Sequence, residues 1–470
     1  MKIESIDIEK TINEAKRLLE NEDGLSSSFK AVIQVLILLV SILINRLKLN
    51  SSNSSKPPSM DPNRKRKKKN TGDKKQGGQN GHKRYRLEKV KNPDRIKILK
   101  VDKKLIPPGK YQEVGFECRQ VVDIEIKKIV TEYRAQVLED SKGKRYVASF
   151  PQGITSDIQY GNGVKAHSVY MSQFQLLPYN RIGDYFAEQM NIPISAGSIF
   201  NFNKEAYDLL QIFDETAKKK LIQSSVVHAD ETGINIEGKL RWLHSASSPL
   251  WTYFYPHEKR GSEAMDAIGI IPNFSGVLCH DHWKSYYNYN CLHALCNAHH
   301  IRELERAIEQ DGQKWAVEMN DFLLEANKDV TNAGGVLSEE AIKESRKKYR
   351  TIIEKGKIEC PEPTKIAGKR GRTKKSKARN LLERFINYEN DVLRFMENDQ
   401  VPFTNNLGEN DLRMTKVQQK ISGCFRSLEG AHIFCRLRSY LSTCRKHGMK
   451  ITDGLKMLFE GKLPSFVNDS

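Results

Sequence analysis

Two short apolar runs that each lead into an acidic residue constrain this chain more than any other feature. Residues 226–229 lead into Asp230, and residues 277–280 lead into Asp281. Runs of this length and composition are typical of buried strands. A carboxylate at the end of a buried strand is costly unless a cation or hydrogen bonds compensate its charge. The sequence therefore predicts two strands whose ends present acids.

A third acid, Glu409, follows an Asn-rich turn and begins a basic, helical stretch. Mg²⁺ prefers hard oxygen ligands, and two such ions roughly 3.5–4 Å apart can activate a nucleophile and neutralise a phosphodiester. In this interpretation Asp230 bridges both ions, Asp281 binds one and Glu409 binds the other. Each acid has an alternative as a helix cap or a surface residue. Glu231 is left out because successive side chains on a strand point to opposite faces.

The charge balance favours a polyanionic partner. The 470 residues carry a formal net charge of +19, with a sequence pI near 9.4, and a chain of this length is expected to form two or three domains. Nucleic-acid-binding proteins most often have such a balance, although ribosomal and membrane-surface proteins share it. Residues 56–104 supply +14 of the total. This segment has three interpretations: it binds phosphates, it is a solvated linker, or it is a localisation tract. Its densest run holds the candidates for phosphate contact: Arg64, Lys65, Arg66, Lys67, Lys68 and Lys69.

The cysteines and the N-terminus predict a cytoplasmic protein. The eight cysteines show no small-domain disulfide framework, which favours a reducing compartment, and the polar N-terminus predicts no signal peptide. Residues 31–44 are apolar but fall short of the roughly 18–20 residues of a membrane span. The a/d pattern across residues 29–47 favours a buried or dimerising helix over a membrane helix.

The expected fold is a multidomain α+β protein with a ribonuclease-H-like α/β catalytic core. The plan of that core consists of three antiparallel strands, a helix and a fourth strand, at residues 225–229, 239–246, 251–255, 262–268 and 277–280. A helical insertion at about residues 300–395 separates it from Glu409. The domains expected in order are N-terminal helices with a possible coiled coil (1–50), a basic disordered linker (51–104), a small β module (105–155), a helical DNA-binding region (156–222), the catalytic domain (223–450) and a C-terminal tail (451–470).

Residues 182–203 have the spacing of a helix-turn-helix. A turn at residues 191–194 precedes Ser195, which is a candidate N-cap for the second helix. Ser195 and Ser198 would face DNA if this helix reads a groove, and a generic helical hairpin is the alternative. Arg413 and Lys416, in the helical stretch after Glu409, are further candidates for DNA contact.

The three segments around the acids resemble the catalytic blocks of bacterial insertion-sequence transposases, specifically the insertion sequence 66 family: residues 228–232, 280–286 and 404–413. Similarity extends over most of the chain, at residues 53–59, 77–82, 119–121, 159–161, 177–181 and 420–427. The resemblance implies a DDE transposase with a ribonuclease-H-like catalytic domain and two Mg²⁺ or Mn²⁺ ions. It implies Asp230, Asp281 and Glu409 as the catalytic and metal-binding triad, and it favours Glu409 over its neighbours Asp411 and Glu429.

Two groups of residues bear on zinc. Members of that family carry paired CxxC motifs after the linker, whereas residues 101–150 of this chain contain only Cys118. One cysteine cannot form a four-ligand zinc site, so we expect no zinc and a module that relies on its β core alone. A second group has three interpretations, namely local packing and hydrogen bonding, support of the active site, or zinc binding: His293, Cys296, His299 and His300.

These features together predict a DNA transposase. Water would cleave at the element's end and release a 3′-hydroxyl, which would then attack target DNA. No Walker motif occurs, so ATP consumption is not expected. The expected partners are the element's inverted-repeat ends, target DNA, a second copy of the chain in a synaptic complex, and accessory proteins of the same element. The alternatives are a nuclease of similar core without strand transfer, and a non-catalytic DNA-binding protein descended from a transposase.

Overall fold

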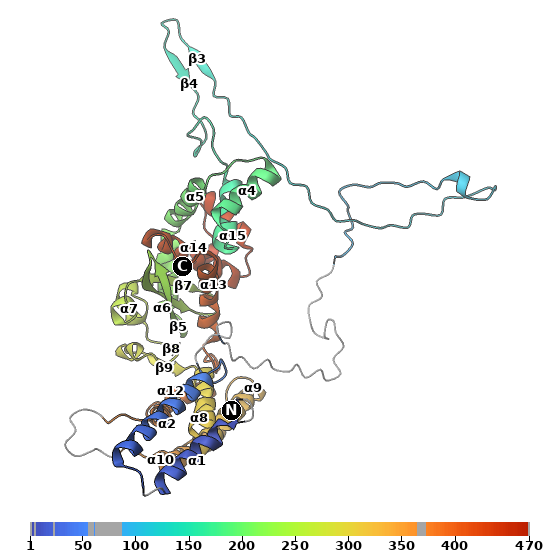
Figure 1. The fold of residues 1–470 in the computed structure, drawn as a ribbon. Helices are drawn as coiled ribbons and strands as arrows, with labels where there is room; N and C mark the ends of the chain where they lie inside the picture. Colours follow the sequence, from blue (N-terminus) through green and yellow to red (C-terminus); the bar gives the residue numbers. More distant parts are fainter. Residues whose placement is uncertain are drawn as a thin grey trace.

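A mixed five-stranded sheet lies at the centre of the computed structural model, which describes residues 2–3, 6–21, 24–54, 61, 87–363 and 373–468 (Figure 1). The strand order is β7-β6-β5-β8-β9. β5, β6 and β7 are antiparallel neighbours, whereas β5, β8 and β9 run parallel. The bounds are β5 Val226–Ile236, β6 Lys239–Ser247, β7 Thr252–His257, β8 Val277–His280 and β9 Leu292–Leu295.

The four expected strands are present, but the first is longer than its apolar run indicated. β5 continues to Ile236 because residues 228–236 pair with β6, whereas its parallel pairing with β8 ends at His228. Asp230 therefore lies in the middle of a strand and not at its end, which corrects the expectation. Asp281 directly follows β8, as expected. The fifth strand, β9, was not predicted.

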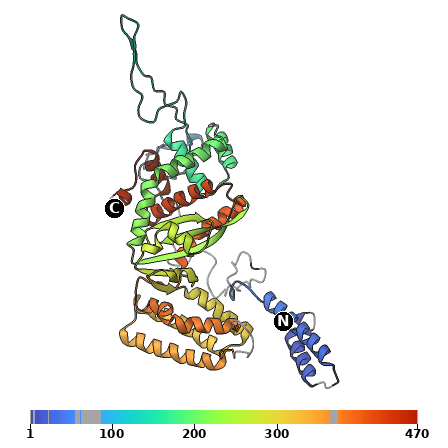
Figure 2. The ribbon, with the colours of Figure 1, turned by 90° about the vertical axis from the view of Figure 1, so that its left-hand side faces the viewer.

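Helices cover both faces of the sheet, which explains why its central strands are apolar on both sides. Val227 and Leu278 pack on one face, with the helices that precede the sheet and with the C-terminal helices. Val226 and Val277 pack on the other face, against the helical insertion. Figure 2 shows the insertion, coloured yellow to orange, on one side of the sheet and the C-terminal helices, in red, on the other.

From residue 162 onwards the helices fall into four groups along the chain. Before the sheet lie α3 Asn162–Val169, a π-helix Tyr170–Phe174, α4 Tyr179–Met190, α5 Ala196–Leu209 and α6 Gln211–Ile222. Between strands lie α7 Ser262–Ile268 and two 3₁₀ helices, Ile271–Asn273 and Lys284–Asn288. The insertion contains α8 Asn297–Asp311, α9 Lys314–Asn332, α10 Glu339–Glu359, α11 Lys377–Asn387, α12 Glu389–Leu393 and a 3₁₀ helix Arg394–Met396. The chain ends with α13 Asn406–Ser422, α14 Leu428–Lys446, α15 Ile451–Phe459 and α16 Ser465–Asn468.

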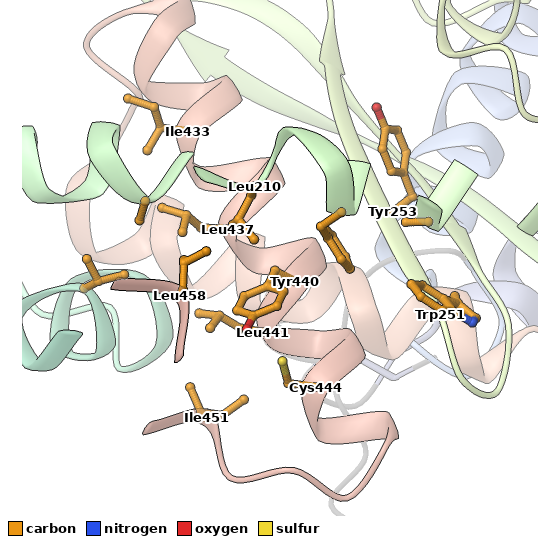
Figure 3. Close-up of a cluster of buried hydrophobic side chains, with 14 of the residues drawn as sticks. Leu210, Trp251, Tyr253, Ile433, Leu437, Tyr440, Leu441, Cys444, Ile451 and Leu458 are labelled. Carbon is orange, nitrogen blue, oxygen red and sulfur yellow. The ribbon is translucent and has the colours of Figure 1, made fainter. Parts of the chain in front are cut away.

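The segment expected to be a C-terminal tail packs into the main hydrophobic core. Figure 3 shows α14 and α15 side chains around Tyr440, facing Leu210 from the helices before the sheet. Ile451, Leu455 and Leu458 are buried at helical spacing. The Tyr440 hydroxyl donates a hydrogen bond to the carbonyl of Gly454 at 2.9 Å. These contacts anchor α14, which lies against β7 of the sheet.

Residues 105–155, expected to form a small β module, contain one short hairpin and no buried residue. β3 Val137–Glu139 pairs with β4 Arg145–Val147, preceded by a 3₁₀ helix at Lys103–Leu105. The residues expected in its core are exposed, including Val121 at 92% and Ile124 at 81%. Figure 1 shows the segment as an extended arm. A two-stranded hairpin offers no second layer on which such side chains can be buried.

The N-terminal region is a helical hairpin, as expected. α1 Ile8–Asn21 packs beside α2 Ser27–Leu47, after a short pair of strands, β1 Lys2–Ile3 and β2 Ile6–Asp7. α2 is long and apolar enough to cross a membrane by length and composition. Apart from its contact with α1, most of its apolar side chains are exposed.

Candidate active site

The fold brings the three predicted acids into electrostatic reach of one another. Asp230 lies in β5, Asp281 follows the adjacent parallel strand β8, and Glu409 lies in the first turn of α13. α13 packs on β5 and β6. The charges of Asp281 and Glu409 both act on the carboxyl group of Asp230. Residues from three distant parts of the sequence therefore share one acidic region.

The pKa of Asp230 is strongly perturbed in this region. Burial is the main reason that its pKa is raised well above the ordinary value of 3.8, and the charges of Glu231, Asp281 and Glu409 raise it further. The backbone N–H of Glu231 donates to Asp230 Oδ1 at 2.9 Å and opposes this rise. A divalent cation among these oxygens would relieve the repulsion. Because the donors of the triad are hard carboxylate oxygens, they fit Mg²⁺ or Mn²⁺.

Asn405 ties β5 to the start of α13. Its buried side chain donates from Nδ2 to the carbonyl of Ala229 at 2.9 Å, and its Oδ1 lies 2.7 Å from Nδ1 of His228. Its backbone N–H donates to Sγ of Cys296 at 3.2 Å. Its carbonyl accepts from the backbone N–H of Glu409 at 3.2 Å. The position of Glu409 relative to β5 therefore depends on Asn405, which the sequence analysis did not single out.

A tight group of ligand atoms lies beside the triad. Among the residues that the structure describes, the metal-ligating atoms of Cys296, His299 and Glu409 lie within 4.8 Å of one another. Asp230 and Asp281 are not members of this group. The structure thus joins Glu409 to two of the four residues that the sequence grouped together.

The other two residues of that sequence group are engaged elsewhere. His293 Nδ1 lies 3.1 Å from Nε2 of His280, and His300 Nδ1 lies 2.9 Å from Oδ1 of Asn297. Burial holds the pKa of His300 well below its ordinary value of 6.5, so its ring is neutral at pH 7. These contacts belong to the packing of β9 and α8 on the sheet.

Asp411 and Glu429, the two alternatives to Glu409 as the third acid, are bound by other side chains of the protein. The carboxylate of Asp411 accepts hydrogen bonds from Ser247 Oγ at 2.6 Å and Thr252 Oγ1 at 3.1 Å, and it pairs with Lys446 at 3.0 Å. Glu429 forms an ion pair with Lys204 at 2.6 Å. Both carboxylates are therefore compensated by cations of the protein, whereas a metal-binding acid needs a carboxylate that is not.

Glu231 lies on the face of β5 opposite to Asp230 and has its own partners. Tyr286 Oη donates to its carboxylate at 2.6 Å, and Arg260 pairs with it at 2.7 Å. The Arg260 guanidinium also stacks 3.6 Å from the ring centre of Trp283, two residues after Asp281. Arg260 was missed from the sequence because it stands alone between elements, with no pattern that marks its partners.

The predicted DNA contacts have different surroundings. Arg64, Lys65, Arg66, Lys67, Lys68 and Lys69 lie outside the described residues. Ser195 is exposed and caps α5 as predicted, because its Oγ accepts from the backbone N–H of Ser198 at 3.0 Å. Arg413 is exposed on α13. Lys416 donates to the carbonyl of Gly233 at 2.7 Å, beside the acidic region.

Comparisons with known proteins identify the class: the chain is a transposase. The model of the Transposase IS66 family matches residues 157–433, which include the sheet, the insertion and all three acids. This match covers more than half of the 470 residues, and the chain belongs to the IS66 transposase family. A second model, described as a family of unknown function, matches residues 5–88 and includes the N-terminal hairpin. No curated protein matches the chain.

Asn405→Ala is expected to destabilise the protein. The change leaves the carbonyl of Ala229 and Nδ1 of His228 without their buried partner, at a cost of about 1–3 kcal/mol for each unpaired group. Thermal unfolding followed by circular dichroism measures the effect. The exposed neighbour Asn406 provides the control, since Asn406→Ala removes an amide without buried partners. Equal melting temperatures for the two variants would contradict this role of Asn405.

Asp230→Asn is expected to raise the melting temperature in EDTA near pH 7, because it removes a buried like charge. Since the folded-state pKa of Asp230 is raised, its contribution to stability is present below its ordinary pKa of 3.8 and is lost as pH rises through the folded-state value. The advantage of the variant should therefore shrink as pH falls towards 4. Mn²⁺ should stabilise the parent protein and not the variant.

Thermal unfolding between about pH 4 and 8 checks this prediction. Asp329→Asn, at an exposed position of α9, is the matched control and should change little at any pH. A metal-free Asp230→Asn protein that melts below the parent at neutral pH would show that the carboxylate is stabilising there, against the expectation.

Proposed function

We propose that this transposase is a DDE enzyme whose mixed sheet is a ribonuclease-H-like core. The observation that carries the proposal is that Asp230 lies in β5 and Asp281 directly follows the adjacent parallel strand β8, with Glu409 on a helix that packs on the same sheet. The strand order β7-β6-β5-β8-β9 supports it, since three antiparallel strands are followed by two parallel ones. The catalytic and metal-binding residues of this proposal are Asp230, Asp281 and Glu409.

The three carboxylates would hold two Mg²⁺ or Mn²⁺ ions. When bound, such ions lower the pKa of a nucleophile and neutralise charge on the scissile phosphate. In this proposal Asp230 would contact both ions, whereas Asp281 and Glu409 would each hold one. Asn405 fixes the backbone before Glu409, and the carboxyl group of Asp230 is half-buried. The contribution of the protein is therefore mainly positioning and charge neutralisation.

The reaction would proceed in two displacements at phosphorus. In the first, water forms a bond to the phosphate at the element's end, and the 3′-oxygen leaves and takes up a proton. In the second, this 3′-hydroxyl loses its proton and attacks a target phosphodiester, whose own 3′-oxygen leaves. Each step exchanges one P–O bond for another, so no external energy source is required.

Basic residues near the acids would hold the DNA backbone. Arg413 is exposed one turn beyond Glu409 on α13, and Lys416 lies one turn further. The basic run Arg64, Lys65, Arg66, Lys67, Lys68 and Lys69 would add non-specific phosphate contacts. The α4–α5 pair, with Ser195 and Ser198 at the N-terminus of α5, would bind the element's ends as a helix-turn-helix. We place this activity in the bacterial cytoplasm, where accessory proteins of the same element could take part.

Glu409→Gln is expected to lower strand cleavage by about 10³-fold or more, because metal binding supplies several kcal/mol of transition-state stabilisation. Asp230→Asn should have a comparable effect, with DNA binding preserved in both variants. Glu429→Gln is the matched control, because Glu429 forms a structural ion pair one helix away. Cleavage is measured on a labelled oligonucleotide that carries the element's end.

The same assay separates the proposal from its alternatives. Joined products formed from a 3′-end oligonucleotide and target DNA support a transposase, whereas cleavage without joining indicates a nuclease. Binding without either product indicates a non-catalytic DNA-binding protein. Cleavage that is unchanged in Glu409→Gln would end the metal-triad proposal.

The N-terminal hairpin would join two copies of the chain. α2 exposes apolar side chains at heptad spacing: Phe29, Leu36, Val40, Leu43 and Leu47. A membrane is a poor occupant, because α1 packs along α2 and carries exposed charges such as Glu14 and Lys16. A second hairpin of the same sequence would cover the apolar face and leave those charges in water.

The double variant Leu36→Lys/Leu43→Lys is expected to lower the molar mass of the full-length protein from that of a dimer or larger assembly to that of a monomer. The physical reason is that two buried lysines at the centre of the heptad stripe cannot be paired with a symmetric copy. Light scattering after size-exclusion chromatography measures the mass. The exposed position Glu14 on α1 serves as the control, because Glu14→Lys adds charge outside the apolar face. Self-association that survives in the double variant would place the interface elsewhere.

A further inference from the structure

We propose that Cys296, His299 and Glu409 form a binding site for a thiophilic divalent cation, Zn²⁺, beside the oxygen-only centre of Asp230 and Asp281. This takes up the zinc interpretation that the sequence left open for this segment. Its ligand set differs from the one suggested by the sequence, because the third ligand comes from α13. The proposal departs from the expectation, drawn from the sequence, that this protein binds no zinc.

The local fold explains why these side chains converge. Cys296 is the N-cap residue of α8, directly after β9, and His299 lies in the first turn of that helix. A cysteine and a histidine three positions apart at a helix start can point to the same side, which makes this spacing common in zinc sites. The first turn of α13 brings Glu409 to them from a position more than 100 residues further along the sequence.

Of the two contacts with Glu409, the one from Cys296 is a long thiol hydrogen bond and the one from His299 is too long for a hydrogen bond. Cys296 Sγ lies 3.9 Å and His299 Nδ1 lies 3.7 Å from Oε1 of Glu409. The N···O separation is too long for a hydrogen bond. With Zn–S near 2.3 Å and Zn–N and Zn–O near 2.0–2.2 Å, neighbouring ligand atoms of a tetrahedral site lie roughly 3.4–3.6 Å apart. The two separations from Glu409 would therefore need to shorten by a few tenths of an ångström, and the ligand atoms of Cys296 and His299 lie within 4.8 Å of each other.

His299 supplies an independent observation. Its Nδ1 atom is buried, and within the described part of the chain it has no hydrogen-bond partner. A buried ring nitrogen without a partner is uncommon and is destabilising unless something satisfies it. Because this nitrogen faces the carboxylate of Glu409, a cation between the two would satisfy both groups.

Cys296 is suited to binding as a thiolate. Its sulfur accepts the backbone N–H of Asn405 at 3.2 Å, an interaction that favours the charged form. Burial nonetheless raises the pKa of the thiol, so the proton must leave when an ion binds. Three protein ligands leave a fourth coordination position open, as in zinc sites that keep a water molecule.

The site has a consequence for activity, and this part rests on the proposed function. One carboxylate of Glu409 would serve two kinds of ion, a thiophilic ion with Cys296 and His299 or a hard ion with Asp230 and Asp281. Zn²⁺ bound by the sulfur and the imidazole would draw Glu409 from the triad. Zn²⁺ should therefore inhibit Mg²⁺-dependent cleavage, and Cys296→Ser should relieve the inhibition.

Titration of the full-length, metal-free protein with Co²⁺ tests the binding directly. Cobalt replaces zinc in such sites, and its bond to a thiolate gives a charge-transfer absorption in the near ultraviolet. We expect this absorption in the parent protein and a loss of at least about tenfold in Co²⁺ affinity in Cys296→Ser and in His299→Gln. Cys424→Ser, at a half-exposed cysteine outside the site, should bind like the parent. Circular dichroism of the metal-free variants checks that each is folded.

Asp230→Asn separates this inference from the proposed function, because it should lose cleavage but keep the thiolate–cobalt absorption. Absence of the absorption in the parent, or its persistence in Cys296→Ser with unchanged affinity, would overturn the cation site and leave the triad standing. Cleavage that persists in Asp230→Asn would instead overturn the triad and leave the cation site standing.

Discussion

The half-buried carboxyl group of Asp230, on which the charges of Asp281 and Glu409 both act, is the constraint on which the rest of the acidic region depends. Such a group is unfavourable by itself, because burial and like charge both oppose ionisation. The surrounding structure must therefore hold the acids in place against their own repulsion. Pairing with β6 and β8 fixes the backbone of β5 on both sides, and Asn405 fixes the start of α13 through Ala229. In the proposed function, a divalent cation held by these carboxylates would relieve the repulsion between them.

Local patterns predicted those parts of this region that depend on local forces. β8 and α7 begin and end where the apolar runs and helical spacing indicated, and Ser195 caps α5 as expected. The length of β5 was underestimated, because its second half is held by pairing with β6 and carries polar residues. The role of Asn405 could not be predicted, since its partners in β5 and at the start of α8 are more than 100 residues away.

The arm at residues 105–155 shows the limit of periodicity as a guide. Alternation of apolar residues at Val121, Ile124 and Ile126 indicated strands with a buried face. An alternating pattern shows only that one side of an extended chain is apolar. Those apolar side chains become buried only if a second layer of structure packs against them. Within this segment no such layer exists, and the side chains are exposed. The opposite error concerns residues 451–470, which were expected to be a tail. Here the short amphipathic helix α15 packs into the hydrophobic core beside α14.

The roles of the acids in and beside α13 follow from their neighbours rather than from their own chemistry. Asp411 and Glu429 each form an ion pair with a lysine. Because the lysine already neutralises the carboxylate, the carboxylate is a poor ligand for a metal ion. Glu409 accepts a long hydrogen bond from the thiol of Cys296 at 3.9 Å, and it lies 3.7 Å from Nδ1 of His299, which is too far for a hydrogen bond. Its charge is therefore available on one side to hard ions and on the other to soft ones. Because a single carboxylate cannot lie in both geometries at once, the identity of the bound ion would decide whether the triad is complete.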